Sequence, residues 1–242
     1  MQYALINEVL ESPFEYKKIV NLTGTDFPVA SNDQLISTLS SETNEFIIGY
    51  RLATDKTDCK DKVLYYYEYD KGKNVRLFWA AIRKILKIKR FKDYDSIGYD
   101  FYFGSEYWAL SYNVVLELMN IWKKDATLRK ILKNASIPSE IWIHTLFFNS
   151  KYAFKGEVFE KQYEGLSKLA PLTYFVYKDA IKVLTAEDYN DILKSGKLFV
   201  RKVITGKSDD LIRSLSLHRK VSDEERKYGG ENMEGQVPGT RL

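Results

Sequence analysis

Apolar and polar residues follow two alternating periods along the first fifty residues. Apolar positions recur at helical spacing in a stretch that ends before Pro13, and a compact apolar run typical of a strand follows. Gly24 and Pro28 then predict a turn, and Ser31 is suited to cap the next helix. The predicted elements are a helix at 3–10, a strand at 18–22, a helix at 31–39 and a strand at 45–50. Strands and helices that alternate in this way predict an α/β fold.

The stretch 75–91 has the pattern of an amphipathic helix with basic residues between its apolar positions. It follows a polar loop at 54–62 and a tyrosine-rich run at 63–69 that predicts a strand. The basic residues of the helix are Arg83, Lys84, Lys87 and Arg90. Two interpretations remain open: a surface helix packed on the sheet, which we favour, and a peripheral contact with anionic lipid headgroups.

The second half of the chain continues the mixed pattern. An apolar stretch at 101–110 is interrupted by Gly104 and Ser105, and Pro138 with Ser139 begins a helix that is apolar around most of its surface. Further elements are predicted as a helix at 113–122, a second short helix after it, a helix at 183–193 and a strand at 198–203. Beyond residue 207 the chain becomes polar and then glycine-rich. We therefore expect a folded domain at 1–207 and a frayed helix with a disordered tail at 208–242.

Composition places the chain among globular proteins. Of its 242 residues, 45% are hydrophobic, which is enough to bury a core. The net charge of +4 lacks the concentrated basic stripe of a dedicated nucleic-acid binder, so no nucleic-acid partner is expected. Cys59 is the only cysteine of the sequence, which excludes an intramolecular disulfide and favours the cytosol. No apolar run approaches the roughly 20 residues that span a bilayer, and the N-terminus has no signal-peptide pattern.

The sequence shows no residues at the spacing of a metal site. His144 and His218 are its only histidines, and neither has a second histidine or a cysteine at ligand spacing. Asp93 and Asp95 form an Asp-x-Asp triplet of the kind that can bind a divalent cation. Because they follow a predicted helix and not a strand, we interpret them as part of a solvated loop. We expect no metal cofactor.

Glu140 is the acidic residue that the pattern singles out. Pro138 and Ser139 place it in the first helical turn, with His144 one turn later on the same face. An acid at this position often only stabilises the helix dipole. Because the helix is apolar around most of its surface, however, we expect Glu140 at the mouth of a pocket. We interpret His144 as a core or supporting residue and not as a catalyst.

Three other segments contain candidate binding residues. Asp26 lies in the turn after the first predicted strand, where α/β proteins commonly bind ligands. Glu106 lies among aromatic residues beside Trp108, where it either faces solvent or accepts hydrogen bonds from sugar hydroxyls. Arg201 and Lys202 come at the end of an apolar strand and form a compact pair of positive charges, which in isolation is usually a surface feature.

Four segments carry a specific combination of residues: LTGTDFP with SNDQLI after it, FGSEYWALS, PSEIWIHTLFFNS and LTAEDYNDILKSGKLFVRK. In this order and spacing they resemble the core-2/I-branching N-acetylglucosaminyltransferases and protein O-xylosyltransferases, glycosyltransferase family 14. The resemblance runs from about residue 3 to residue 203. It implies a GT-A fold, with a mixed sheet flanked by helices. It also implies an inverting transfer from a UDP-sugar to a glycan or other hydroxyl acceptor, without a bound metal.

The resemblance further implies roles for individual residues. Glu140 takes the place of the family's catalytic glutamate, and Arg201 and Lys202 lie where basic residues contact the donor diphosphate. Glu106 matches an acidic position of some members. The residues expected to bind the acceptor or the sugar are Glu106, Trp108 and Asp26. The chemistry is consistent, because a carboxylate can take the proton of the attacking hydroxyl and two cations can stabilise departing UDP without a metal.

Two features depart from the family pattern. Its members normally begin with a nucleotide-binding portion of roughly a hundred residues, whereas about 20 residues precede the first segment here, so we expect an N-terminally truncated form. Animal relatives have many cysteines and a membrane anchor. Their absence predicts a bacterial-type member in the cytoplasm or at its membrane, with the Golgi lumen as the location of a eukaryotic one.

The donor sugar expected from the resemblance is N-acetylglucosamine or xylose. Two alternatives to an active transferase remain open. One is a catalytically incomplete fragment that binds glycan without turnover. The other is a peripheral membrane or scaffold protein that uses the helix at 75–91.

Overall fold

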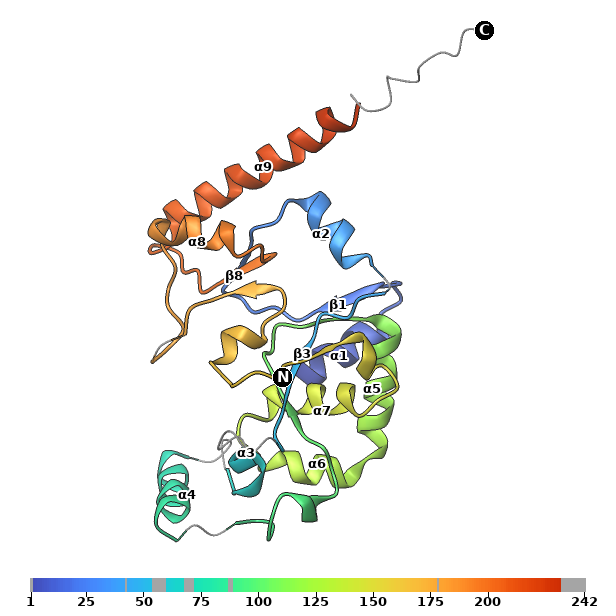
Figure 1. The fold of residues 1–242 in the computed structure, drawn as a ribbon, viewed down its shortest axis with the longest axis vertical. Helices are drawn as coiled ribbons and strands as arrows, with labels where there is room; N and C mark the ends of the chain where they lie inside the picture. The colour runs from blue at the N-terminus through green and yellow to red at the C-terminus, as the bar shows by residue number, and fades with distance from the viewer. Residues whose placement is uncertain are drawn as a thin grey trace, which may run out of the picture. The chain divides into compact units, whose positions relative to one another are not determined.

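The structure is a computed structural model of the chain, and it describes residues 2–41, 43–53, 60–67, 72–86, 89–177 and 179–231. The chain forms two compact units. The first consists of Met1–Asn21 and Glu42–Pro171, and the second of Leu22–Ser41 and Leu172–Leu242. Each unit is therefore built from segments that are far apart in the sequence, as the colours of Figure 1 show.

The first unit contains two small sheets in its described part. In one, β1 (Lys18–Val20) pairs antiparallel with β5 (Ala109–Ser111), and Phe46 extends this pairing by a bridge to Ala109. The other has the order β4-β3-β6, formed by Tyr102–Phe103, Ile48–Arg51 and Glu157–Val158. Because β3 is antiparallel to β4 and parallel to β6, this sheet is mixed.

Helices flank these sheets. They are α1 (Gln2–Glu11), α3 (Asp61–Leu64), α4 (Lys73–Leu86), α5 (Tyr112–Lys124), α6 (Ala126–Lys133) and α7 (Trp142–Phe148), with short 3-10 turns η2 (Asp95–Ile97), η3 (Pro138–Glu140), η4 (Ala153–Lys155) and η5 (Leu166–Leu169). Asp125 separates α5 from α6, and its carboxylate caps α6 by accepting a hydrogen bond from the Leu128 N–H at 2.8 Å. α7 packs against α5 and β4, and all seven of its residues are buried.

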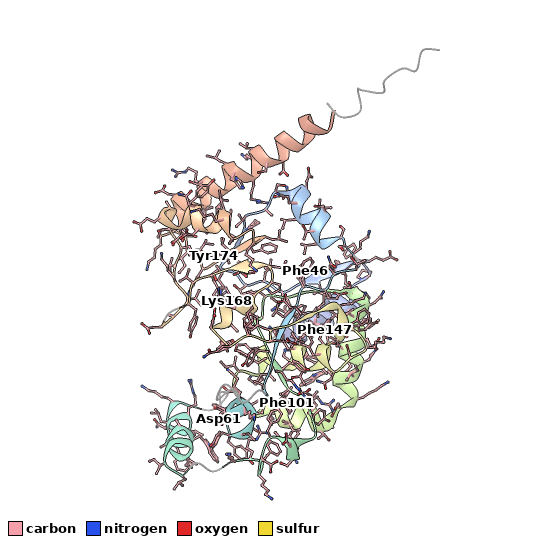
Figure 2. The ribbon with its side chains drawn as sticks, in the orientation of Figure 1. Phe46, Asp61, Phe101, Phe147, Lys168 and Tyr174 are labelled. Atoms are coloured by element: carbon pink, nitrogen blue, oxygen red, sulfur yellow. The ribbon has the colours of Figure 1, made fainter. Side chains whose placement is uncertain are left out.

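The core of the first unit is aromatic and tightly packed. Phe101 and Phe147 are fully buried within it (Figure 2). A Cβ atom on Gly49 would lie 2.2 Å from the Phe148 ring, so glycine is needed for β3 to approach α7 this closely. Close packing of this kind fixes the position of α7, and with it the segment that leads into the helix.

The second unit contains one three-stranded sheet in its described part. β8 (Phe199–Arg201) lies between β2 (Asp26–Pro28), to which it is antiparallel, and β7 (Thr173–Tyr174), to which it is parallel. The other elements are α2 (Asn32–Leu39), η6 (Ala186–Asp188), α8 (Tyr189–Lys194) and α9 (Asp209–Glu231). Ser31 and Thr185 begin α2 and η6 with capping boxes. The apolar core consists of Val29, Leu184, Ile192, Val200, Val203, Leu211 and Leu215.

The predicted mixed α/β class is confirmed in the form of small sheets flanked by helices. The predicted helices at 3–10, 31–39 and 113–122 are present, as are strands within 18–22 and 198–203. Three local predictions were wrong. The turn predicted around Gly24 and Pro28 contains β2, because Asp26, Phe27 and Pro28 lie opposite β8. The strand predicted at 63–69 is replaced at its start by α3, and the single helix predicted from Pro138 breaks at Ile141.

The segment beyond residue 207 begins with a helix. It contains α9 as far as Glu231, in the region where a frayed helix was predicted. The tail predicted after this helix, together with Cys59 and Lys87, lies outside the described residues. Within the described ranges, no helix combines the length and the apolar character that crossing a membrane requires.

Candidate active site

Glu140 lies at the end of η3, directly before α7. The preceding Ile137 adopts φ 48° and ψ 66°, a left-handed conformation that is strained for a β-branched residue. Pro138 begins the turn, and its carbonyl accepts a hydrogen bond from the Ile141 N–H at 3.1 Å. The backbone therefore turns between Glu140 and His144, which the sequence had predicted on one continuous helix. Strained backbone is concentrated at functional sites in proteins, which makes this turn a candidate.

The loop after β4 lies directly against this turn. The Gly104 N–H donates a hydrogen bond to the Glu140 carbonyl oxygen at 2.9 Å. A Cβ atom on Gly104 would lie 2.3 Å from His144 Nε2 and 2.4 Å from the Ile48 carbonyl oxygen. The contact therefore requires glycine at this position. Through it, the loop that contains Glu106 is held beside the turn that contains Glu140.

The Glu140 carboxyl group has an unusual protonation equilibrium. Burial raises its pKa from 4.5 to about 7, the positive charge of Lys62 lowers it, and the negative charge of Glu106 raises it again. A carboxyl group with a pKa near neutrality is ionised in a large fraction of molecules at pH 7 and can take a proton from a bound hydroxyl group. The structure thus brings together two acids that the sequence had predicted from separate segments.

Lys62 is a neighbour of Glu140 that the sequence did not indicate. It lies in α3, and its ammonium nitrogen is 4.3 Å from the centroid of the Phe103 ring, a cation–π contact. Its carbonyl oxygen accepts a hydrogen bond from the Ser136 N–H at 2.6 Å, which ties α3 to the segment before η3. In the sequence, Lys62 belongs to a polar loop, where a lysine is normally solvated, so no local pattern distinguished it.

Glu106 and Trp108 lie in the loop between β4 and β5. The Glu106 carbonyl accepts hydrogen bonds from Asn21 Nδ2 at 2.7 Å and from the Trp108 N–H at 3.1 Å, and the Glu106 side chain is half-buried. Trp108 is fully buried, and its indole N–H has no hydrogen-bond partner among the described residues. A buried indole contributes to the core. The structure therefore adds no support to sugar stacking on Trp108, which stays a prediction.

His144 is a buried residue in the middle of α7. Burial lowers its pKa to about 3, and the Glu140 carbonyl opposes this effect. In the described part of the chain, neither ring nitrogen has a hydrogen-bond partner of normal geometry. The imidazole is therefore neutral at physiological pH, which agrees with its interpretation as a core or supporting residue.

Asp26 and Arg201 form an ion pair in the second unit. They lie opposite each other in the pairing of β2 with β8, and Arg201 Nη1 is 3.3 Å from Asp26 Oδ1. The Asp26 and Arg201 side chains are 1% and 18% exposed, and Asp26 also accepts a hydrogen bond from the Thr23 N–H at 2.7 Å. Arg201 donates further to the Thr23 hydroxyl and, at 3.2 Å, to Thr25 Oγ1. The structure thus pairs a predicted sugar-binding acid with a predicted phosphate-binding base.

Lys202 directly follows β8. Its N–H donates to the Lys182 carbonyl at 3.4 Å, and its carbonyl accepts from the Leu184 N–H at 2.9 Å. Its side chain is half-buried, and among the residues that the structure describes its ammonium group has no hydrogen bond or ion pair. Of the two predicted phosphate-binding residues, Arg201 is thus paired with Asp26, and contact of either residue with a diphosphate stays a prediction.

The second unit also contains a cavity of about 400 Å³, lined by residues of α2, α8 and α9 and by the segment before β8. His218 and Lys197 are among its lining residues. None of the six predicted site residues lines it.

Over the described residues, no group of three or more histidine, cysteine, aspartate and glutamate side chains is arranged to hold a metal ion.

A mixed α/β protein with small sheets flanked by helices is compatible with a glycosyltransferase. Residues 1–163 match the family model described as Core-2/I-Branching enzyme. Because the match covers more than half of the chain, the protein belongs to the Core-2/I-Branching enzyme family, whose members are glycosyltransferases. A comparison with curated proteins gives no match.

The family match divides the predicted site residues into two groups. Those inside it are Asp26, Glu106, Trp108 and Glu140, and those beyond it are Arg201 and Lys202. The suspected family is thus confirmed on the segments that contain the carboxylates. The segment around β8 is assigned to the family by its resemblance alone.

Proposed function

We propose that this protein transfers a sugar from a UDP-sugar to a hydroxyl group of a glycan acceptor, with inversion and without a bound metal. Glu140 is the proposed general base, and N-acetylglucosamine or xylose is the proposed sugar. The observation that carries the proposal is the Glu140 carboxyl group, whose pKa is raised to about 7 within the stretch that matches the family.

The proposed reaction needs one base on the acceptor side. The acceptor oxygen forms a bond to the anomeric carbon while the bond between that carbon and the UDP oxygen breaks. Glu140 takes the hydroxyl proton, and UDP leaves with the electron pair of the broken bond. Because the acceptor attacks from the face opposite to UDP, one displacement inverts the anomeric centre. A base whose pKa lies near 7 is suited to this proton transfer at neutral pH.

The departing UDP needs stabilisation of its negative charge, and Lys202 is the proposed source. Its ammonium group has no anionic partner among the described residues, whereas the Arg201 guanidinium is bonded to Asp26 and Thr25. We assign Arg201 the role of holding the segment 23–26 against β8, beside the residue that contacts the diphosphate. A preorganised cation stabilises a leaving group without solvent reorganisation.

The proposal is tested by incubating the purified protein with a panel of UDP-sugars and glycan acceptors and analysing the products by mass spectrometry. We expect one donor to give a glycosylated product and free UDP, with a rate that EDTA leaves unchanged. A rate that collapses in EDTA and returns with manganese contradicts the metal-independent mechanism, and glycan binding without UDP release identifies a binding module.

Lys202→Ala is expected to weaken UDP binding about tenfold, the effect of losing one charge-assisted contact. Lys207→Ala removes the same charge from an exposed turn of the same unit and is the control.

Lys62→Met is expected to move the acid side of the pH–rate profile to higher pH. Lys62 lowers the pKa of Glu140, so its removal leaves burial and Glu106 to raise that pKa above about 7. Since the base acts only when ionised, the variant loses rate near pH 6.5 and recovers it at alkaline pH. The measurement is kcat against pH for the wild type, Lys62→Met and Lys133→Met, an exposed lysine of α6. An unchanged profile in Lys62→Met would remove Lys62 from the site.

A further inference from the structure

The segment around α4 has an extreme charge pattern. Between residues 71 and 92 the sequence has no acidic residue. Its nine basic residues are Lys71, Lys73, Arg76, Arg83, Lys84, Lys87, Lys89, Arg90 and Lys92. The whole chain has 37 basic residues against 33 acidic ones, so this segment alone has more than the net positive charge of the protein. A positive charge this concentrated favours an anionic partner.

The same helix exposes large apolar side chains. Leu77, Phe78 and Ile85 are 58%, 60% and 74% exposed. Ile85 follows Phe78 by seven residues and Leu77 by eight, so the three side chains lie along one side of the helix. The sequence had favoured a surface helix that packs its apolar side on the sheet. The structure corrects this prediction, because much of that apolar side is open to solvent.

The contacts of α4 with the rest of the unit involve a different part of the helix. Within α4, the centroid of the Trp79 ring lies 5.4 Å from that of the Tyr66 ring. Arg90, which follows the helix, has its guanidinium 5.3 Å from the centroid of the same tyrosine ring. Trp79 and Ile82 are half-buried, in contrast to Leu77 and Ile85. Figure 1 shows α4 beside α3 at the edge of the first unit. The helix is thus anchored through Trp79 and presents its Leu77 and Ile85 side outward.

We propose that α4 binds the surface of an anionic lipid bilayer. In this arrangement, Leu77, Phe78 and Ile85 enter the boundary between headgroups and acyl chains, while exposed basic residues such as Lys73 and Lys89 contact anionic headgroups. Amphipathic helices with lysine and arginine beside large apolar residues bind membranes by combining these two contributions. The helix lies on the bilayer and does not cross it, because it is too short and too highly charged to span.

The charge pattern also favours an anionic bilayer over two other binding partners, a second copy of the chain and a nucleic acid. A second copy of the chain would bring two surfaces of the same sign together, and like charges at an interface oppose association. A nucleic acid would match the charge but offers no apolar interior for Leu77, Phe78 and Ile85. An anionic bilayer satisfies both features, since it has a negative surface and an apolar layer directly beneath it. The inference does not depend on the proposed transfer reaction.

The test is flotation of the whole protein with vesicles of phosphatidylcholine, alone or mixed with phosphatidylglycerol. We expect binding to the mixed vesicles that decreases with salt, and weak binding to the neutral ones. Phe78→Ser with Ile85→Ser should lower the partition coefficient at least about tenfold, since each substitution removes a large apolar side chain from the interface. Lys73→Gln, Lys84→Gln and Lys89→Gln together should lower it about a hundredfold, at roughly fivefold per charge.

The control removes three charges elsewhere in the same unit. Lys123→Gln, Lys130→Gln and Lys133→Gln change exposed lysines of α5 and α6, and this variant should keep most of the vesicle binding. Circular dichroism checks that every variant is folded. Equal losses in the control and the α4 variants, or a wild-type protein that ignores anionic vesicles, would overturn the proposal. So would a wild-type dimer without vesicle binding that Phe78→Ser with Ile85→Ser converts to a monomer.

Discussion

Replacing Glu140 by glutamine is expected to lower the rate of sugar transfer at least about a hundredfold while the protein stays folded. The amide keeps the shape of the side chain but cannot accept the proton of the attacking hydroxyl group. The rate is measured from UDP release at saturating donor and acceptor. Glu8→Gln is the matched control, because it makes the same substitution at an exposed position of α1 in the same unit and leaves Glu140 and Glu106 in place. A Glu140→Gln variant with nearly wild-type turnover would show that another group is the base.

The same substitution, which lowers activity, is expected to raise the stability of the folded protein at neutral and alkaline pH. The pKa of Glu140 rises from 4.5 to about 7 in the folded state. Between these values the folded state binds more protons than the unfolded state, so the free energy of unfolding falls as pH rises. Glutamine carries no charge at any pH. Above pH 7 we therefore expect Glu140→Gln to be more stable than the wild type by up to about 3 kcal/mol.

Urea unfolding at several pH values measures this difference. Below about pH 4.5 it should vanish, because the carboxyl group is then protonated in both states. A variant that is both inactive and more stable at alkaline pH identifies Glu140 as an acid kept for function at a cost to folding. A variant that is less stable at every pH would indicate a structural carboxylate.

The second large effect is expected at the Asp26–Arg201 ion pair. Asp26→Ala should lower the free energy of unfolding by about 3 to 5 kcal/mol, because it leaves a largely buried guanidinium without its carboxylate. Asp26 is 1% and Arg201 18% exposed, so solvent compensates for little of this loss. Arg201→Ala should be similarly destabilising, and any loss of UDP binding in that variant must be separated from unfolding.

A double-mutant cycle distinguishes pairing from general damage. Asp26→Leu combined with Arg201→Met should be much less destabilised than the sum of the two single variants, since the combination leaves no unpaired buried charge. Urea denaturation of the four proteins gives the coupling free energy. A coupling below about 0.5 kcal/mol, the usual scatter of additive sites, would contradict a structural role for the pair.

Short sequence patterns correctly predicted those helices and strands whose formation depends on residues close by in the sequence. Ser31 is followed three residues later by Gln34, and both halves of that capping box form. The run 63–69 fails for the opposite reason. Its β-branched and aromatic residues favour a strand, but Val63 and Leu64 are buried in the core as part of α3. Strand propensity largely reflects the packing environment, which sequence alone does not provide.

The candidate site was predictable only where one segment contains the chemistry. Glu140 stands out as an acid before an apolar helix, and that pattern is local. Arg201 and Asp26 are 175 residues apart, and the pairing that joins them arises when β2 and β8 meet. Lys62 approaches Glu140 through a fold that places α3 near η3. Charged residues that are far apart in the sequence and meet only in the fold leave no periodic pattern from which their contact could be predicted.

The discontinuous second unit has a consequence for synthesis. Residues 22–41 leave the ribosome before residues 172–242, and 130 residues lie between residue 41 and residue 172. β8 begins 171 positions after β2 ends, so at about 5 to 20 residues per second β2 waits roughly 9 to 34 seconds for β8. During this interval Val29 and its neighbours have no core to enter, because the rest of that core comes from Leu184 onward. Expression yield should therefore depend on keeping this early segment from aggregating until the last third of the chain is made.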